Sequence, residues 1–425
     1  MSRAKKDSEV SQIRTVTPRK AKKLIAHCMS KKRAVFVWGA PGICKSDLIA
    51  EIAQEQSRKV IDMRLLLMAP EDLKGIPYFD SEEGTMRWAP ASELPEIVTV
   101  EMVAEQKVIA DAFEAAFVEV KNAVNFTAAE KAVKLAQALD NWNKAKGRMK
   151  RLVGSLEFQN AILFLDEMNS APQNVQGAAY QLVLNRKIGE YHLPDGVDLV
   201  AAGNRDTDKG VTYRQPTPLS NRFIHLNLEV SYEDWQVWAL RNGINADIVG
   251  FLKTQPHKLF MFDPKSPDKA FATPRSWKFV HDLIDPTLAD DELTTLVSGT
   301  VGEGVALEFM AHRRLSGQMP DPKEVLDGLV KKLDIKDMSA KYSLTISMCY
   351  LLKEYFEKTK KKEMKSDDFH RKFDNYLFFI MKFMEAEMVI LGAKTVMKDF
   401  AVDINHEKLS SFEQFYEKYG SLVVD

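Results

Sequence analysis

Residues 39–46 read Gly39-Ala-Pro-Gly-Ile-Cys-Lys-Ser46, and they stand between a short apolar run, Ala34–Trp38, and a helical pattern that continues to about Gln56. A strand, a glycine-rich turn and a helix in this order form a unit whose backbone N–H groups and helix N-terminus can wrap a phosphate. The next run, Lys59–Leu65, has strand character again. The sequence therefore predicts an α/β fold with a parallel sheet and a phosphate-binding loop.

This loop nearly matches the pattern G-x-x-x-x-G-K-[ST], in which the lysine reaches the β- and γ-phosphates of a nucleotide and the hydroxyl binds Mg²⁺. Lys45 and Ser46 hold those positions, but Cys44 stands where the pattern has its last glycine. A left-handed backbone there costs a residue with a Cβ roughly 1–2 kcal/mol. The alternative is an ordinary strand-to-helix turn. The predicted ATP-binding residues are Gly39, Ala40, Pro41, Gly42, Ile43, Cys44, Lys45, Ser46 and Asp47.

A second signal lies further along the chain, where four apolar residues, Ile162–Leu165, lead into Asp166 and Glu167. A carboxylate at the carboxyl end of a central strand lies beside the phosphate loop in α/β folds. We expect Asp166 to hold Mg²⁺ together with Ser46, and Glu167 to orient and polarise an attacking water. An apolar run before Asp-Glu is common by chance, but here it follows a phosphate loop and an intervening strand.

Three further residues fit a nucleotide-hydrolysing site by their order and spacing. Asn204 ends the predicted strand Leu199–Ala202 and could hydrogen-bond the attacking water. Arg222 precedes the following strand and could stabilise transition-state charge on a neighbouring subunit's nucleotide. Arg275, in Thr273-Pro-Arg-Ser276, would begin a helix that points at the phosphates. Taken singly, each residue also fits a turn asparagine or a surface arginine.

The rest of the chain alternates between these elements and helical segments. Residues 69–96 are rich in Pro, Gly and acidic groups and predict a loop or hairpin, and residues 97–157 predict a helical insertion. Thr127-Ala-Ala-Glu130 has capping-box form, so a second helix of the insertion should begin there. The remaining predictions are a helix at 172–185, a hairpin at 189–196, strands at 198–202 and 224–230, and helices from Ser231 almost to the end.

Composition excludes several classes of protein. The 425 residues carry 59 Lys+Arg and 60 Asp+Glu, a net charge of -1 that gives no overall attraction to nucleic acid or anionic membranes. The three cysteines show no C-x-x-C spacing, and no apolar stretch follows the basic Met1–Lys6, so we expect a cytoplasmic protein without a signal peptide. Tyr376–Leu391 is apolar but interrupted by charges, which predicts a buried helix and no membrane span.

Two features remain open between a functional and a structural interpretation. The insertion has a basic end, residues 144–151, which would suit an acidic partner or nucleic acid, but a solvated helix end explains it more simply. Trp235, Trp238 and Trp277 fit the core of a helical domain better than a platform for stacking bases.

At this point the sequence resembles the MoxR branch of AAA+ ATPases. The resemblance rests on Ala69–Pro77, Met86–Pro90, Leu165–Pro172, Leu193–Gly196, Ala201–Asn204, Leu219–Phe223 and Ala272–Trp277, and it covers most of residues 17–284. It implies a nucleotide-binding core (1–230), an α-helical lid (231–285) and a helical extension (286–425). It also implies a hexameric ring with chaperone-like work on protein complexes, whose partners often carry von Willebrand A domains. By the same resemblance Asn204 is sensor 1, Arg222 the arginine finger and Arg275 sensor 2.

Two departures from the family pattern leave alternatives open. Cys44 in place of glycine puts turnover in doubt, so the chain could be a nucleotide-binding scaffold that hydrolyses ATP weakly or not at all. The insertion at 97–157 is longer than the resemblance accounts for. A ring that loads nucleic acid is the other alternative, although the charge balance makes nucleic acid an unlikely partner.

Overall fold

The structure is a computed structural model that describes residues 14–81, 83–208, 213 and 217–424. The basic Met1–Lys6 lies outside these residues. The chain divides into two compact units, residues 1–229 and 230–425. Each unit has a hydrophobic core of its own.

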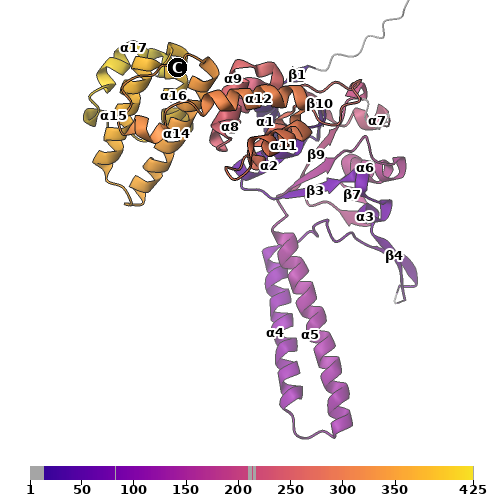
Figure 1. Cartoon of the computed structure of the whole chain (residues 1–425). Coiled ribbons are helices and arrows are strands. Elements are labelled where there is room, and N and C mark those ends of the chain that lie inside the picture. Colours follow the sequence, from indigo (N-terminus) through magenta and orange to yellow (C-terminus); the bar gives the residue numbers. More distant parts are fainter. Residues whose placement is uncertain (1–13, 82, 209–212, 214–216, 425) are drawn as a thin grey trace, which may run out of the picture. The chain divides into compact units, whose positions relative to one another are not determined.

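The main sheet belongs to the first unit. Its strands are β1 (Thr15–Val16), β2 (Val35–Trp38), β3 (Val60–Arg64), β6 (Ile162–Asp166), β9 (Asp198–Gly203) and β10 (Ile224–Leu228). Within the described residues these six strands are all parallel, in the order β1-β10-β2-β9-β6-β3 (Figure 1). Apart from β1, which is too short to show a periodicity, they match the predicted strands. The predicted α/β fold class with a parallel sheet and a helical C-terminal part is confirmed.

Helices pack on both faces of this sheet. Successive side chains of a strand point to opposite faces, and on β6 Leu163 and Leu165 share a buried cluster with α6 (Gln173–Asn185). Ile162 and Phe164 point to the other face, where α2 (Lys45–Glu55) contacts β6 and β3, and α1 (Pro18–Ser30) contacts β2 and β10. The alternation therefore places Asp166 on the same face as α2.

Two small hairpins interrupt the α/β pattern. After α3 (Pro70–Lys74), strands β4 (Ile76–Asp80) and β5 (Thr85–Ala89) pair antiparallel, so the predicted excursion at 69–96 is confirmed. The hairpin predicted at 189–196 lies earlier, as β7 (Lys187–Ile188) and β8 (Tyr191–His192). The segment after β8 is held by Arg186, whose Nη2 donates to the carbonyls of Pro194 and Val197, both at 2.7 Å.

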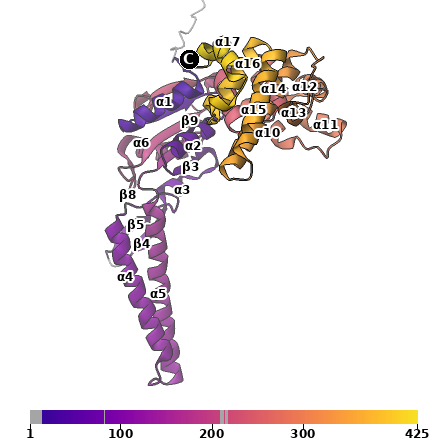
Figure 2. The ribbon, with the colours of Figure 1, turned by 90° about the vertical axis from the view of Figure 1, so that its left-hand side faces the viewer.

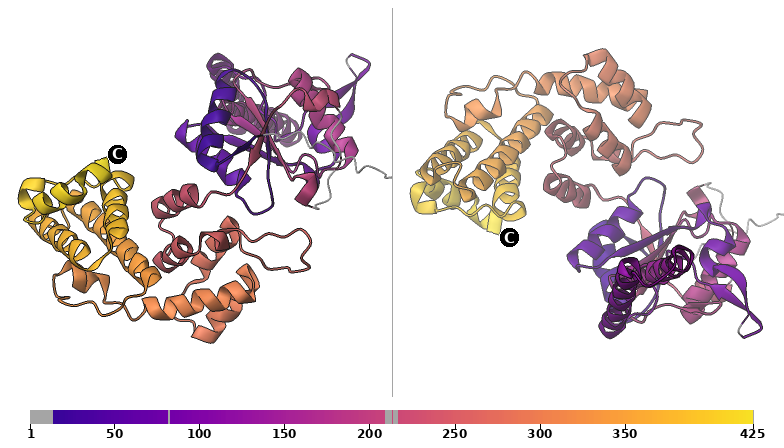
Figure 3. Two further views of the ribbon diagram at one scale, coloured as in Figure 1. Left: turned by 90° about the horizontal axis from the view of Figure 1, so that it is seen from above. Right: turned by 90° about the horizontal axis from the view of Figure 1, so that it is seen from below.

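The predicted insertion is a pair of long antiparallel helices, α4 (Val100–Asn122) and α5 (Ala128–Leu156). They extend from the α/β core in Figures 1 and 2, and the right-hand view of Figure 3 looks nearly along them. The capping box at the start of α5 is confirmed. The Thr127 N–H donates to Glu130 Oε2 at 3.0 Å, and the Glu130 N–H donates to Thr127 Oγ1 at 3.4 Å.

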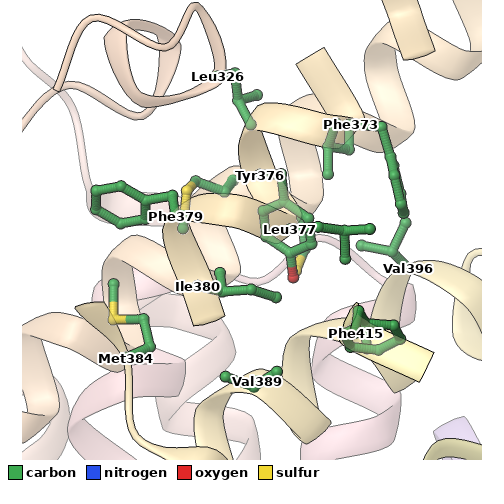
Figure 4. Packing of buried hydrophobic residues seen from close by; sticks show 14 of the residues in the cluster. Leu326, Phe373, Tyr376, Leu377, Phe379, Ile380, Met384, Val389, Val396 and Phe415 are labelled. Atoms are coloured by element: carbon green, nitrogen blue, oxygen red, sulfur yellow. The ribbon is translucent and has the colours of Figure 1, made fainter. Parts of the chain in front are cut away.

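The second unit is helical throughout its described residues. Its α-helices are α8 (Tyr232–Arg241), α9 (Ala246–Thr254), α10 (Pro274–Leu283), α11 (Asp290–Val301), α12 (Glu303–Ser316), α13 (Pro322–Leu326), α14 (Met338–Lys360), α15 (Ser366–Phe383), α16 (Ala386–Lys394) and α17 (Phe412–Val424). Two buried clusters organise it. One surrounds Trp277 and includes Trp235, with Trp238 packed at its edge, as predicted for these tryptophans. The other surrounds Tyr376 (Figure 4).

The prediction of one buried helix at Tyr376–Leu391 is wrong, because this segment is divided between α15 and α16. The chain leaves α15 at Met384, where φ is -108° and ψ is 154°, and α16 begins two residues later. The extended backbone brings Glu385 to Lys341 of α14, whose ammonium lies 2.8 Å from the carboxylate. No helix among the described residues is long and apolar enough to cross a membrane.

Candidate functional site

The phosphate-loop residues connect β2 to α2 as the sequence predicts. Strand β2 ends at Trp38, which is paired in register with Gly203 at the end of β9, and the Gly39 N–H donates to the Gly203 carbonyl at 3.2 Å. Gly42 has a φ of 78° and Cys44 a φ of 62°. Cys44 therefore adopts the left-handed conformation that favours glycine, immediately before the first turn of α2.

Lys45 lies at the centre of the loop. Its ammonium donates to the Gly39 carbonyl at 2.7 Å, to the Ala40 carbonyl at 3.1 Å and to Asn204 Oδ1 at 3.0 Å. The lysine therefore joins the loop after β2 to the residue after β9, which are neighbouring strands. An ammonium held among oxygens in the concave side of a glycine-rich loop can exchange those oxygens for phosphate oxygens.

A hydroxyl and a carboxylate meet beside this lysine. Ser46 Oγ donates to Asp166 Oδ2 at 2.9 Å, across 120 residues of sequence. Mg²⁺ in nucleotide sites is bound through one or two protein oxygens, and phosphates and waters complete the octahedron. The donor set of Ser46 and Asp166 fits that requirement. Among the described residues there is no group of three or more His, Cys, Asp or Glu side chains arranged to hold a metal ion without such a substrate.

A third oxygen-bearing residue near this pair was not predicted. Asp62 lies on β3, the strand beside β6. Burial and the neighbouring Asp166 carboxylate raise the pKa of Asp62, and Arg64 lowers it in part. The sequence shows Asp62 as a polar residue between the apolar Ile61 and Met63 of a strand. It does not show that this strand lies beside β6, and Asp62 was therefore missed.

Glu167 follows Asp166 in a strained backbone. Its φ is 54°, a conformation that residues with a Cβ rarely adopt. The Glu167 N–H donates to Asp166 Oδ1 at 2.9 Å, and the next N–H, of Met168, donates to the Ala202 carbonyl of β9 at 3.0 Å. These bonds fix the turn, and the Glu167 side chain is half-buried at the carboxyl end of β6.

Asn204 is held in place by a residue that the sequence reasoning missed. Asn169 Nδ2 donates to the Asn204 carbonyl at 2.8 Å, and the Asn204 N–H donates to Asn169 Oδ1 at 3.2 Å. A Cβ at Gly203 would lie 2.1 Å from that same Oδ1, so the glycine is required for the approach. Asn169 is almost fully buried. It orients the backbone of Asn204, whose side chain contacts Lys45.

The two predicted arginines lie apart from this group. Arg222 is exposed in the turn between α7 (Thr217–Ser220) and β10, and its guanidinium makes no hydrogen bond or ion pair to the described residues. Arg275 is exposed at the start of α10 in the second unit. Asp47 is exposed in the first turn of α2. The roles of these three residues stay predictions.

One histidine connects the end of β2 to the turn that carries Arg222. Trp38 Nε1 donates to His225 Nδ1 at 2.9 Å, and His225 Nε2 lies 2.7 Å from the Ser220 carbonyl. An indole nitrogen only donates, so Nδ1 accepts and the Nε2–H donates a hydrogen bond to the Ser220 carbonyl. Both imidazole nitrogens of His225 are therefore used.

Comparison with known proteins adds little to this geometry. No family model matches the chain, and no curated protein matches it. Among solved structures, a proline-to-glycine mutant of RuvB from Thermotoga maritima aligns with 73% of this chain and 75% of that chain, at 14% identity and a TM-score of 0.30. A TM-score of that size does not establish a common fold.

Proposed function

We propose that this chain is an ATP-hydrolysing AAA+ ring ATPase of MoxR type that remodels or assembles a protein partner. One observation carries the first part of the proposal. Lys45 and Ser46 begin α2, and they bond to residues at the ends of the neighbouring strands β9 and β6, with Lys45 3.0 Å from Asn204 and Ser46 2.9 Å from Asp166. This is the set of residue types that binding and hydrolysis of a nucleoside triphosphate requires.

Each residue has a distinct task in this proposal. Lys45 binds the β- and γ-phosphate oxygens as a point charge, and Ser46 and Asp166 hold Mg²⁺, which supplies charge neutralisation when bound. Glu167 accepts a hydrogen bond from the attacking water and aligns it with the γ-phosphate. Asn204, fixed by Asn169, gives the water a second polar contact. The strained turn at Glu167 supports this assignment, because such strain is concentrated at functional sites.

The ring, the partner and the division into a core, a lid and an extension at residues 230 and 285 rest on the MoxR resemblance. In this proposal the exposed Arg222 reaches the nucleotide of the next subunit, and Arg275 approaches the phosphates of its own. A homo-hexamer acting on a protein substrate or a von Willebrand A domain is the arrangement that we propose. Arg222 is exposed and its guanidinium has no partner among the described residues, which supports a contact in trans.

A nucleotide-binding scaffold is the second candidate, and Cys44 favours it. Its left-handed backbone and its Cβ both lie in the phosphate loop. The two candidates differ in turnover and agree in ATP binding. Steady-state hydrolysis by the unmodified chain, compared with Glu167→Gln, separates them, because hydrolysis that Glu167→Gln does not reduce would leave no role for the proposed site.

Replacement of Lys45 tests the nucleotide site itself. Lys45→Ala should lose measurable binding of Mg-ATP in isothermal titration calorimetry, because the phosphates lose their charge partner inside the loop. Lys20→Ala is the matched control, since Lys20 is exposed on α1 in the same unit. Equal ATP affinity in both variants would contradict the proposed function.

A further inference from the structure

The α4–α5 pair is a largely exposed structure. Phe117 and Trp142 stack across it with ring centroids 5.3 Å apart, and Gln106 Nε2 donates to the Ala145 carbonyl at 3.3 Å. Yet no residue of α4 is buried, and on α5 only Ala145 and Leu152 are. The two helices therefore contact each other along one stripe and present the rest of their surface to solvent.

The two helices carry opposite charge. Helix α4 has five acidic and two basic residues, and α5 has two acidic and seven basic residues. The acidic residues of α4 are Glu101, Glu105, Asp111, Glu114 and Glu119. The basic residues of α5 are Lys131, Lys134, Lys144, Lys146, Arg148, Lys150 and Arg151.

These charges do not neutralise each other inside the pair. Within the described residues, which include all of both helices, no ion pair joins α4 to α5. Lys144 pairs with Asp140 of its own helix, at 2.8 Å, and Arg148 contacts Glu96 at the base. An acidic helix beside a basic one would be explained by mutual pairing, and that pairing is absent here.

Exposed apolar side chains accompany the charges on both helices. On α4 Val108 is 69% exposed and Val118 46%. On α5 Val133 is 68% exposed and Val153 40%. Because residues three or four apart share a helix face, Val108 lies on the face of Glu105 and Val153 on the face of Lys150, so aliphatic and charged groups share these surfaces.

Acidic residues of α4 and basic residues of α5 also lie at the same level along the two helix axes. The Gln106–Ala145 hydrogen bond sets the level of two antiparallel helices that each rise about 1.5 Å per residue. Glu105 is then level with Lys146, and Glu101 with Lys150. Two copies standing side by side in the same orientation would therefore bring acidic and basic residues together. Copies in opposite orientations would instead place Glu101 and Glu105 near the tip of α5.

We infer that α4 of one copy of this chain packs along α5 of the next copy. The occupant of each helix surface is thus a second copy, selected by charge complementarity and by the exposed valines. Two α4 helices or two α5 helices would repel each other, so the contact joins different surfaces of the two copies. Such heterologous contacts form a ring where the rotation between copies closes. The inference rests on the proposed ring and adds to it a contact outside the α/β core. The basic end of α5 is thereby an interaction surface and more than a solvated helix end.

Charge reversal on the full chain tests this contact. The α4 variant is Glu101→Lys with Glu105→Lys, and the α5 variant is Lys146→Glu with Lys150→Glu; all four side chains are exposed. Each variant alone should associate at least 10-fold more weakly in sedimentation velocity with Mg-ATP. A variant carrying all four changes should return to within about 3-fold of the parent, because complementarity is restored.

Mixing the two variants gives a result that a folding defect cannot imitate. An α4 variant next to an α5 variant has attractive contacts on both sides, so an equimolar mixture should assemble although neither component does. The matched control is Glu413→Lys with Glu417→Lys on α17, two exposed residues at helical spacing, and it should assemble normally.

Three outcomes would overturn the inference. One is unchanged association of both single-helix variants. Another is loss of association that neither the four-residue swap nor the mixture restores. DNA binding lost only in the α5 variant, with association unchanged, would mark the basic helix as a nucleic-acid surface and likewise overturn it. ATP affinity is also measured for each variant and should stay normal in every α4 and α5 variant. Failure of the proposed function would appear separately, as unchanged ATP affinity in Lys45→Ala.

Discussion

At the scale of single residues, Cys44 is the unusual position of the phosphate loop. Its φ of 62° costs a residue with a Cβ roughly 1–2 kcal/mol. Glycine removes that cost but loses roughly 0.5–1 kcal/mol through the greater freedom of the unfolded chain. Cys44→Gly should therefore change stability by less than about 1 kcal/mol. It should hydrolyse ATP at least as fast as the parent, because the Cβ no longer stands beside the phosphates. A clear drop in kcat would show that the thiol contributes to turnover.

The same cysteine should be the reactive thiol of the folded chain. Burial raises the pKa of Cys28 and raises that of Cys349 to about 12, and both effects suppress the thiolate that alkylating agents attack. Cys44 is half-buried in the loop. Iodoacetamide should modify Cys44 first, block ATP binding, and be excluded by bound Mg-ATP, as peptide mass spectrometry would show. Cys44→Gly provides the unlabelled control, and hydrolysis by the alkylated chain at the parent rate would contradict the assignment.

The sequence reaches some of these residues and not others. Lys45, Ser46 and Asp166 were predicted because loop and strand-end patterns fix their residue types at known spacings, and the structure brings them together. Asn169 was missed because its task is to hold a backbone. That task depends on the gap left by Gly203, and no local pattern records such an approach.

At the scale of elements, the end of the sheet opposite the site depends on one buried ion pair. Arg58 Nη1 lies 2.8 Å from Asp198 Oδ2, and the two side chains are 8% and 7% exposed. The same guanidinium donates to the carbonyls of Asn160, Ala161 and Gly196. It thereby joins the segment before β3 to the starts of β6 and β9.

Removal of this guanidinium should weaken the first unit strongly. Arg58→Ala removes the nearer of the two cations beside Asp198 and leaves the carboxylate with Lys32, 3.2 Å away. Breaking a buried pair typically costs about 3–5 kcal/mol, and because Lys32 remains we expect a loss of about 3 kcal/mol. The measurement is the free energy of unfolding in urea, followed by a probe in the first unit such as Trp38 fluorescence. Arg64→Ala is the control, because Arg64 is 62% exposed and 3.8 Å from Asp62, and it should change stability by less than about 1 kcal/mol. A loss below 1 kcal/mol in Arg58→Ala would show that water replaces the pair.

Element boundaries were predictable where apolar periodicity fixes them. The strands around the site and the start of α5 follow from alternation and from the Thr127 capping box. The break between α15 and α16 was not predictable, because the apolar pattern runs through it. After the break Glu385 pairs with Lys341, 44 residues away in the sequence, a contact that no local pattern records.

At the scale of the whole molecule, the proposed ring makes a prediction about mixtures. If Arg222 acts on a neighbour's nucleotide, Arg222→Ala should bind ATP almost normally and lose turnover by roughly 10³-fold or more. Glu167→Gln should also bind without turnover, because its water is not polarised. An equimolar mixture should recover activity at interfaces that pair the intact Glu167 of one variant with the intact Arg222 of the other.

The measurement is phosphate release by the mixture, with ring assembly measured on the same sample. Full activity of Arg222→Ala alone would refute the arginine finger. Absence of rescue, with mixed rings verified by native mass spectrometry, would argue for tight coupling around the ring. The sequence could suggest Arg222 and Arg275 but could not fix their roles, since their proposed targets are phosphates and, for Arg222, a second copy.

In the proposed ring, His225 would connect the phosphate loop to the turn that carries Arg222. Its imidazole spans the gap between Trp38, one residue before the phosphate loop, and the Ser220 carbonyl, two residues before Arg222. A shift of the loop on gaining or losing a phosphate would pull directly on the turn that carries the arginine. Each subunit could then advance or withdraw its contact with the next according to its own nucleotide. Neighbouring subunits of the proposed ring would then hydrolyse ATP one after another, with His225 as the connecting side chain.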